Sequence, residues 1–201
     1  DDLSAGRVTL GVGVAVAEDE YANLGVDFSK RGKIANEMLA AMQVLWREEV
    51  PEFSGELYQF QGLRFEPKPV QAPHPPILVG GASAAAFRRI ALYGDGWHPL
   101  SPSVNEVVKG IEDIAGACRK VERDPASVRI CPRLIVRFME EPWDRPLKDR
   151  RTLRGTVEEV RAMLDAYRQA GVDEVVLDGN TPDLDEAAGL MERVESELMT
   201  G

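Results

Sequence analysis

The feature that most constrains the fold is a repeated alternation of short apolar segments with amphipathic ones. Five times along the chain, a strand-length apolar run precedes a stretch whose apolar residues recur at the 3.6-residue period of a helix. This alternation is typical of α/β proteins, in which parallel strands are joined by right-handed helical crossovers. We expect strands at residues 8–14, 77–79, 95–99, 128–138 and 173–178. No domain linker interrupts the pattern, so we expect a single domain over residues 1–201.

The second of these units, ILVGGASAAAFRRIALYGDGW at residues 77–97, has glycines between its strand and its helix. Ser83 is suited to cap the start of the helix, and Gly94 stands where a helix ends in the left-handed conformation. Free N–H groups at such a helix start, together with the helix dipole, favour an anion such as a phosphate. The alternative is an ordinary tight turn, because a glycine pair without a Walker lysine or a dinucleotide fingerprint is a weak signal.

The same stretch resembles the signature of the luciferase-like monooxygenase family, especially its deazaflavin-dependent oxidoreductases. LSAGRVTLGVGVAV at residues 3–16 and the run from Phe53 through PKPVQAPHPP, which ends at residue 76, also fit that family. The resemblance implies a (β/α)₈ barrel that binds a flavin such as FMN or an F420-type deazaflavin. It places the cofactor's phosphate near Gly80, Gly81, Ala82 and Ser83. It implies an oxidoreductase or monooxygenase that acts on a small organic substrate, with the chemistry residing in the cofactor.

Three further residues are candidates for cofactor contact. In the resembling family, the end of the first strand lies against the cofactor, and this contact maps onto Val14 and Ala15. Here Ala15 and Val16 replace the usual glycine and aromatic residue. His98 could donate a hydrogen bond to an anion or to a flavin-ring oxygen, or it could be satisfied by backbone at the rim. His74, in the proline-rich connector, is expected to be an exposed loop residue. No catalytic residue is predicted.

The length of the chain conflicts with a complete barrel. A barrel of this type needs about 250 residues, whereas this chain has 201 and only five strand–helix units. We therefore expect a partial barrel that lacks about three N-terminal units and has two open strand edges. This supports a second hypothesis, a non-catalytic partial barrel that forms a homodimer or higher homo-oligomer through those edges. A third is a barrel enzyme that uses a phosphorylated substrate and no flavin.

Two segments stand outside the alternation. Residues 49–76 are predicted to form a hairpin-like insertion, with EFSGELYQF and LRFEPKPVQ joined at Gln61-Gly62. Such an insertion could shape a substrate pocket or could be a surface flap. Residues 140–154 carry the one basic cluster of an acidic chain. They could form a mobile loop that closes over a phosphate or an acidic cofactor tail, or simply a solvated loop.

Composition excludes several other classes of protein. The net charge of −10 argues against nucleic acid or an anionic membrane as a partner. No apolar run is long enough for a membrane span, and the first residues do not resemble a signal peptide. Cys118 and Cys131 belong to no CxxC motif or Cys/His cluster, so no metal site is expected. Two unpaired cysteines fit a reducing cytoplasm.

Overall fold

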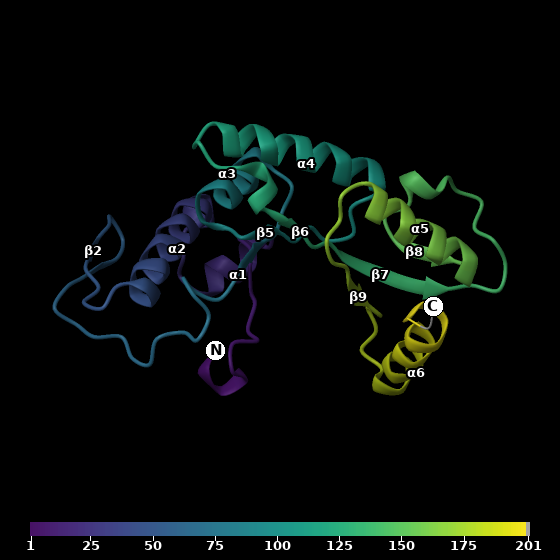
Figure 1. Ribbon diagram of the computed structural model, residues 1–201, viewed down its shortest axis with the longest axis horizontal. Helices are drawn as coiled ribbons and strands as arrows, with labels where there is room; N and C mark the ends of the chain where they lie inside the picture. The colour runs from purple at the N-terminus through teal and green to yellow at the C-terminus, as the bar shows by residue number, and fades with distance from the viewer. Residues whose placement is uncertain (200–201) are drawn as a thin grey trace.

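The computed structural model describes residues 1–199 and shows an α/β protein built from five consecutive strand–helix units (Figure 1). The strands of these units are β1 (Leu10–Val12), β4 (Ile77–Val79), β5 (Gly96–Trp97), the pair β6 (Arg129–Ile130) and β7 (Arg133–Phe138), and β9 (Val176–Asp178). The helices that follow them are α1 (Glu18–Asn23) and α2 (Arg31–Arg47), α3 (Ala84–Tyr93), α4 (Val104–Arg119), α5 (Val157–Gln169) and α6 (Leu184–Val194). The predicted alternation and the number of units are confirmed.

The strands of the five units are parallel and lie side by side in the order of the sequence. One sheet has the order β1-β4-β5-β6, and β7 pairs with β9 in a second sheet. A bridge between Leu100 and Arg133 links the two sheets. Pro132, which cannot donate a backbone hydrogen bond, separates β6 from β7 as the sequence predicted. Within residues 1–199 the strands do not close into a ring, because β1 and β9 each pair on one side only.

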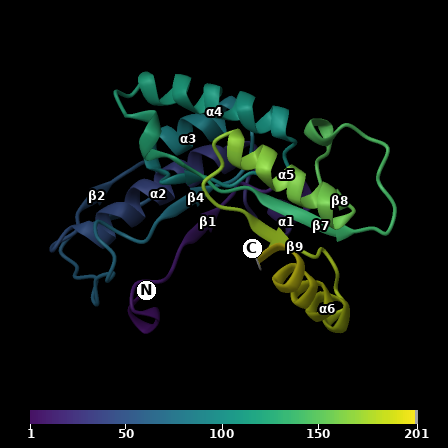
Figure 2. The same cartoon turned by 45° about the vertical axis from the view of Figure 1, so that its right-hand side comes forward.

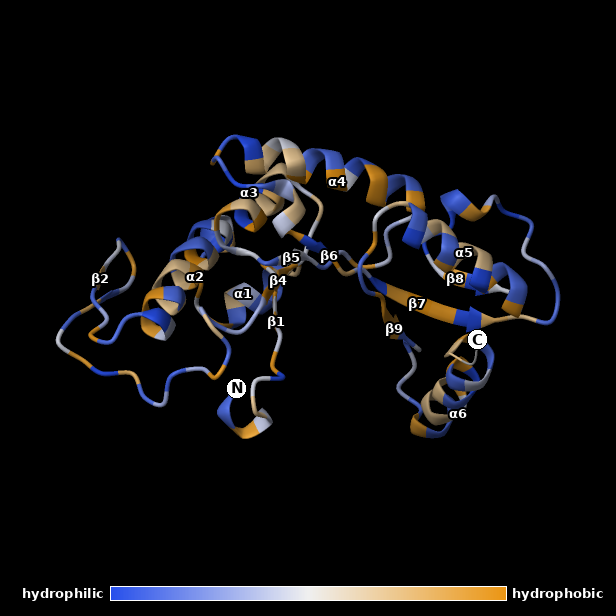
Figure 3. Ribbon diagram, viewed as in Figure 1, coloured by the Kyte–Doolittle hydropathy of each residue, from blue (hydrophilic) through white to orange (hydrophobic). Residues whose placement is uncertain are grey.

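The helices cover one side of the strands and leave much of the other side open. On β7, Leu134 and Val136 are fully buried, whereas Arg133 and Arg137 point to the opposite side and are exposed. That opposite side carries ion pairs, such as the one between Arg133 and Asp178 of β9 at 2.7 Å. Figures 1 and 2 show α3 and α4 packed side by side, and Figure 3 shows apolar residues concentrated on β7. The described part of the chain holds no helix that is both long and apolar enough to cross a bilayer.

Most helix starts follow the caps that the sequence predicts. Ser103 with Glu106 and Thr156 with Glu159 form complete capping boxes for α4 and α5. One predicted cap is wrong. Ser29 precedes the amphipathic residues of α2, which predicts that it caps this helix, but Asp27 caps a 3₁₀ turn at Phe28–Lys30 by accepting from the Ser29 amide, and α2 begins only afterwards.

Gly94 does not adopt the left-handed conformation that was predicted for it. Its φ of −93° and ψ of 148° are extended. A side chain is nevertheless excluded, because a Cβ would lie 2.8 Å from Val79 Cγ2 and 3.2 Å from the backbone of Ile90. Arg123 satisfies the helix end by donating from Nη1 to the carbonyls of Gly94 (2.6 Å) and Ile90 (3.0 Å). Close packing, not backbone conformation, requires the glycine.

The segment between α2 and β4 contains a hairpin, but its turn lies earlier than predicted. β2 (Phe53–Ser54) pairs antiparallel with β3 (Gln59–Phe60), so the turn falls at residues 55–58 and not at Gln61-Gly62. Glu37 of α2 holds this turn, since its carboxylate accepts from the amides of Leu57 (2.6 Å) and Tyr58 (2.7 Å). Met38 of the same helix, expected in the core, is exposed.

His74 is buried, which contradicts the expectation of an exposed loop residue. Only 5% of its surface is accessible, and its ring lies 5.6 Å from the ring of Trp46. Arg47 Nη2 donates to Nε2 at 2.6 Å, and Nδ1 donates to the Pro75 carbonyl at 2.8 Å. Both ring nitrogens are thus used in packing the connector beneath α2.

The basic loop contains a further strand and is tied to two helices. β8 (Leu153–Gly155), which the sequence did not reveal, pairs parallel with β7. Arg150 is 2% exposed and pairs with Glu159 of α5 at 2.7 Å. Arg151 pairs with Glu106 of α4 at 2.5 Å. Arg150 and Arg151 therefore hold the loop to the capping-box glutamates, and the buried Arg150 is not available to a phosphate.

The remaining elements of the described residues are short helical turns. They are 3₁₀ turns at Asp2–Ser4, Pro125–Ser127 and Leu147–Asp149, and a π-helical turn at Glu195–Met199.

Replacing Gly94 by alanine should destabilise the protein, although any residue can adopt the φ and ψ of this position. The added Cβ would overlap Val79, so we expect a loss of about 1–3 kcal/mol in the free energy of unfolding. Urea denaturation measures it, and Gly116→Ala, at a position where a Cβ meets only Arg119 Nη2 at 3.7 Å, is the control. Equal stability of Gly94→Ala and the native chain would show that packing does not require this glycine.

The ion pair of Glu159 predicts a specific pH dependence. The hydrogen bond from Arg150 holds the pKa of Glu159 below its ordinary value of 4.5. Its stabilisation is therefore fully present above about pH 4.5 and is lost as the pH falls through the lowered pKa. Glu159→Gln should lower the free energy of unfolding by about 2 kcal/mol at pH 7 and by much less at pH 3.

Urea denaturation at the two pH values measures this difference. Glu192→Gln, an exposed position on α6, is the control. A Glu159→Gln penalty of the same size at both pH values would contradict the role of the ion pair.

Candidate functional site

The ends of β1, β4 and β5 meet at one edge of the sheet. The Gly80 amide donates to the Val12 carbonyl at 2.8 Å, and the His98 amide donates to the Val79 carbonyl at 2.9 Å. Because the three strands are parallel and in register, the segments that follow them leave from the same edge. This brings the predicted residues of three distant stretches to one rim: Val14 and Ala15, Gly80 to Ser83, and His98.

The turn from β4 into α3 presents an open helix start. Gly81 has a φ of 91°, a conformation that glycine adopts without strain. The Ser83 hydroxyl accepts from the Ala86 amide at 3.2 Å, which leaves the amides of Ala84 and Ala85 without an intrahelical partner. Residues 81–85 are all exposed, so no side chain among residues 1–199 plugs this helix start. With the positive end of the helix dipole, these amides form a surface suited to an anion.

His98 is held by the next strand. Its Nδ1 lies 2.6 Å from the Cys131 carbonyl, and since a carbonyl can only accept, Nδ1 donates. In the neutral ring the proton is therefore on Nδ1, and Nε2 is an acceptor. The sequence suggested a donor role for His98, whereas with the proton on Nδ1 the free ring nitrogen, Nε2, accepts. The alternative, that His98 is satisfied by the backbone, holds for Nδ1. Within residues 1–199, Nε2 has no hydrogen-bond partner.

The β1 side of the rim is open space. Ala15 has a φ of 45° and is exposed, and the Val14 carbonyl accepts from the Tyr21 hydroxyl at 3.0 Å. A Cβ placed at Gly11 or Gly13 would meet nothing within 4 Å. The described residues therefore leave this side of β1 uncovered, next to the start of α3.

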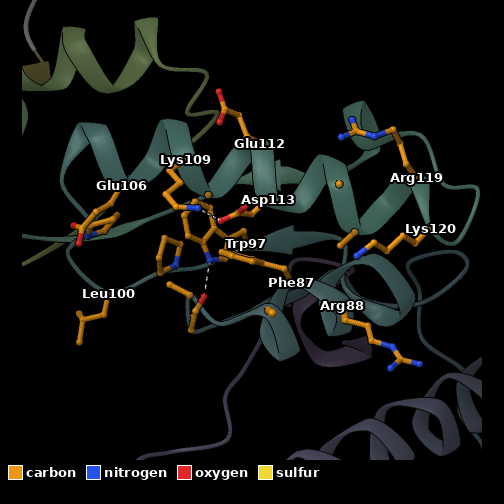
Figure 4. A pocket seen from close by; sticks show the side chains of 18 of the residues that line it. Phe87, Arg88, Trp97, Leu100, Glu106, Lys109, Glu112, Asp113, Arg119 and Lys120 are labelled. Carbon is orange, nitrogen blue, oxygen red and sulfur yellow. Dashed lines mark hydrogen bonds and ion pairs between the residues drawn. The ribbon is translucent and has the colours of Figure 1, made fainter.

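One residue of this site was missed by sequence reasoning. Trp97 is 1% exposed, as expected of an apolar ring in the core. Its indole Nε1 also donates to the Gly81 carbonyl at 2.7 Å, the dashed line that starts at Trp97 in Figure 4. In the sequence, only the position of Trp97 one residue before His98 could have suggested this contact. Trp97 and Gly81 are 16 residues apart, so no local pattern reveals the hydrogen bond between them.

A groove of about 1190 Å³ opens beside the turn and runs between α3 and α4. Gly81 and Ala82 are among its lining residues, and Figure 4 shows Arg88, Arg119 and Lys120 together in one part of it. The described residues contain no group of three or more His, Cys, Asp or Glu side chains that could hold a metal ion. Burial raises the pKa of the Cys118 and Cys131 thiols, so both stay protonated near neutral pH.

Comparison with known proteins identifies relatives that match part of this chain. An uncharacterised protein of Mycobacterium tuberculosis is 41% identical over 120 residues, 58% of this chain and 42% of the relative. An FMNH₂-dependent dimethylsulfone monooxygenase of Pseudomonas putida is 27% identical over 117 residues, 57% of this chain and 32% of the relative. The chain thus spans less than half of the length of these curated relatives.

Solved structures share the fold. The monooxygenase RslO1 of Streptomyces bottropensis matches with a TM-score of 0.83 and 23% identity, over 99% of this chain and 70% of that one. An F420-dependent secondary alcohol dehydrogenase matches with a TM-score of 0.75 and 16% identity, over 94% of this chain and 69% of that one.

The match to a family model covers more of this chain than the match to either of the two relatives described. The family model of the luciferase-like monooxygenases covers residues 1–144, well over half of the chain, and includes all three stretches that form the rim. This chain belongs to the luciferase-like monooxygenase family.

Proposed function

We propose that this chain is the cofactor-binding part of an oxidoreductase that uses a flavin such as FMN or an F420-type deazaflavin on a small organic substrate. The observation that carries the proposal is the exposed start of α3 beside His98, at the edge where three parallel strands end. A relative named for its use of FMNH₂ and a structural neighbour named for its use of F420 support a cofactor of this type.

Each part of the rim would have a separate task. The amides at residues 82–85 would hold the anionic end of the cofactor, with the dipole of α3 behind them. The open side of β1 at Gly11 and Gly13 leaves room for a ring, next to Val14 and Ala15. Nε2 of neutral His98 would accept a hydrogen bond from an N–H or O–H group of the cofactor or substrate. The bound cofactor would supply the electron transfer, which the side chains of this rim do not offer.

Two alternatives rest on specific features. The free edges of β1 and β9, with half-exposed Val8 (38%) and Val176 (39%) nearby, favour a homodimer or higher oligomer, in which the partial barrel could be non-catalytic. The same α3 amides would equally hold the phosphate of a substrate in an enzyme without flavin. A cytoplasmic location, which two buried free thiols fit, is part of the proposal.

Replacing Ala82 by aspartate tests the anion site. A carboxylate at the helix start should repel the cofactor's phosphate and weaken FMN or F420 binding about tenfold. Ala82 is preferable to Gly81, since an aspartate at a φ of 91° would strain the turn by itself. Titration followed by flavin or deazaflavin fluorescence measures the affinities.

Ala162→Asp, an exposed position on α5, adds the same charge away from the rim and should leave both affinities unchanged. Equal binding by Ala82→Asp and the native chain would refute the site. Failure of the folded native chain to bind any of these cofactors would refute the proposed function and favour the alternatives.

A further inference from the structure

The side chain of Trp97 is locked between two helices. The edge of Phe87, from α3, meets its ring at a centroid distance of 5.7 Å and an interplanar angle of 75°. On the α4 side the ring occupies the space above Gly110, where a Cβ would overlap it. The indole therefore has one available orientation, and in that orientation Nε1 lies 2.7 Å from the Gly81 carbonyl oxygen. Figure 4 shows the ring reaching from under α4 to this carbonyl.

This contact also determines where the next amide points. The Gly81 carbonyl and the Ala82 N–H belong to one peptide unit, and the peptide between them is trans. In a trans peptide the C=O and N–H bonds are coplanar and point in opposite directions. Since the carbonyl points toward the buried indole, the Ala82 N–H points away from it. Ala82 is exposed, and across residues 1–199 its amide has no partner.

The turn would not hold this orientation by itself. Gly81 has no Cβ and tolerates a wide range of φ and ψ, so its peptide unit can rotate at little cost. Residue 80 is fixed by the Gly80–Val12 hydrogen bond, and residue 83 by the cap of α3. The Trp97 hydrogen bond is the interaction that fixes the peptide unit between these two points. A hydrogen bond accepted by the carbonyl also polarises the peptide, which makes its N–H a better donor.

We propose that Trp97 is a positioning residue for the anion site. Through the Gly81 carbonyl, its indole N–H holds the Ala82 amide toward the open rim, where that amide donates to a phosphate group of the cofactor. The inference rests on the proposed function and adds a specific determinant of phosphate recognition to it. Two successive residues then contribute to one rim from opposite sides: Trp97, the last residue of β5, from the helix layer, and His98, which directly follows β5, from the strand end.

A packing role for Trp97 and this positioning role predict different results. If the ring only fills the core, its replacement lowers stability and affects all ligands of the folded protein alike. If the N–H orients the Ala82 amide, its replacement affects only ligands that carry a phosphate. FMN and riboflavin differ by that phosphate, so the ratio of their affinities separates the two roles independently of stability.

The experiment measures the FMN and riboflavin dissociation constants of this chain, with Trp97→Phe as the test variant and Val107→Ala as the control. Val107 is fully buried in the same cluster, so its truncation loosens the core without touching the hydrogen bond. We expect the native chain and Val107→Ala to prefer FMN. Trp97→Phe should bind FMN about tenfold more weakly, the loss of one hydrogen bond to a charged group, with riboflavin affinity unchanged.

A second replacement keeps the test valid if Trp97→Phe does not fold. Benzothienylalanine at position 97 preserves the shape of the ring and has sulfur in place of the N–H, and it should give the same loss. An unchanged preference for FMN in either folded variant would overturn the positioning role while leaving the proposed function intact. A native chain that binds both flavins without preference would overturn the anion site and this inference together. If the native chain binds neither flavin, the same comparison is made with F420 and its phosphate-free deazaflavin chromophore, and failure to bind these as well would refute the proposed function.

Discussion

The parallel pairing of β1, β4 and β5 is the constraint on which the site depends. The backbone bonds from Gly80 to Val12 and from His98 to Val79 align three strand ends, so residues separated by more than 80 positions share one rim. Active sites of barrel enzymes lie at this carboxyl edge for the same reason. What makes this edge suitable for an anion is local to one turn. Gly81 allows the chain to enter α3 at once, and short side chains leave the amides open.

The rest of the structure supports that edge from the outside. α3 and α4 enclose Trp97, which connects the core to the turn. Arg150 and Arg151 tie the basic loop to α5 and α4 through the same glutamates that cap these helices. The loop is therefore part of the scaffold at these two points. The uncovered side of the sheet, by contrast, carries ion pairs and glycines where a complete barrel would be packed with side chains.

Features governed by neighbouring residues were predictable, and features governed by distant contacts were not. The capping boxes of α4 and α5 are four-residue patterns, so they could be located from the sequence. The burial of His74 depends on Trp46 and Arg47 of a preceding helix, and the need for a glycine at position 94 depends on Val79. β8 follows a polar loop and is stabilised by its partner β7, so it lacks a pattern of its own. The rim residues were located through family resemblance, whereas the tautomer of His98 required the position of Cys131.

The central claim is that the amides opening α3 bind the anionic end of the cofactor. The most direct measurement is a two-dimensional ¹H–¹⁵N spectrum of the labelled chain, recorded during titration with FMN. The account predicts that the amide signals of Ala82, Ala84 and Ala85 shift downfield together and saturate, as amides do when they donate to a phosphate. Saturable binding that leaves these three signals in place, and shifts those of residues 140–152 or of the β1 and β9 edges instead, would contradict it.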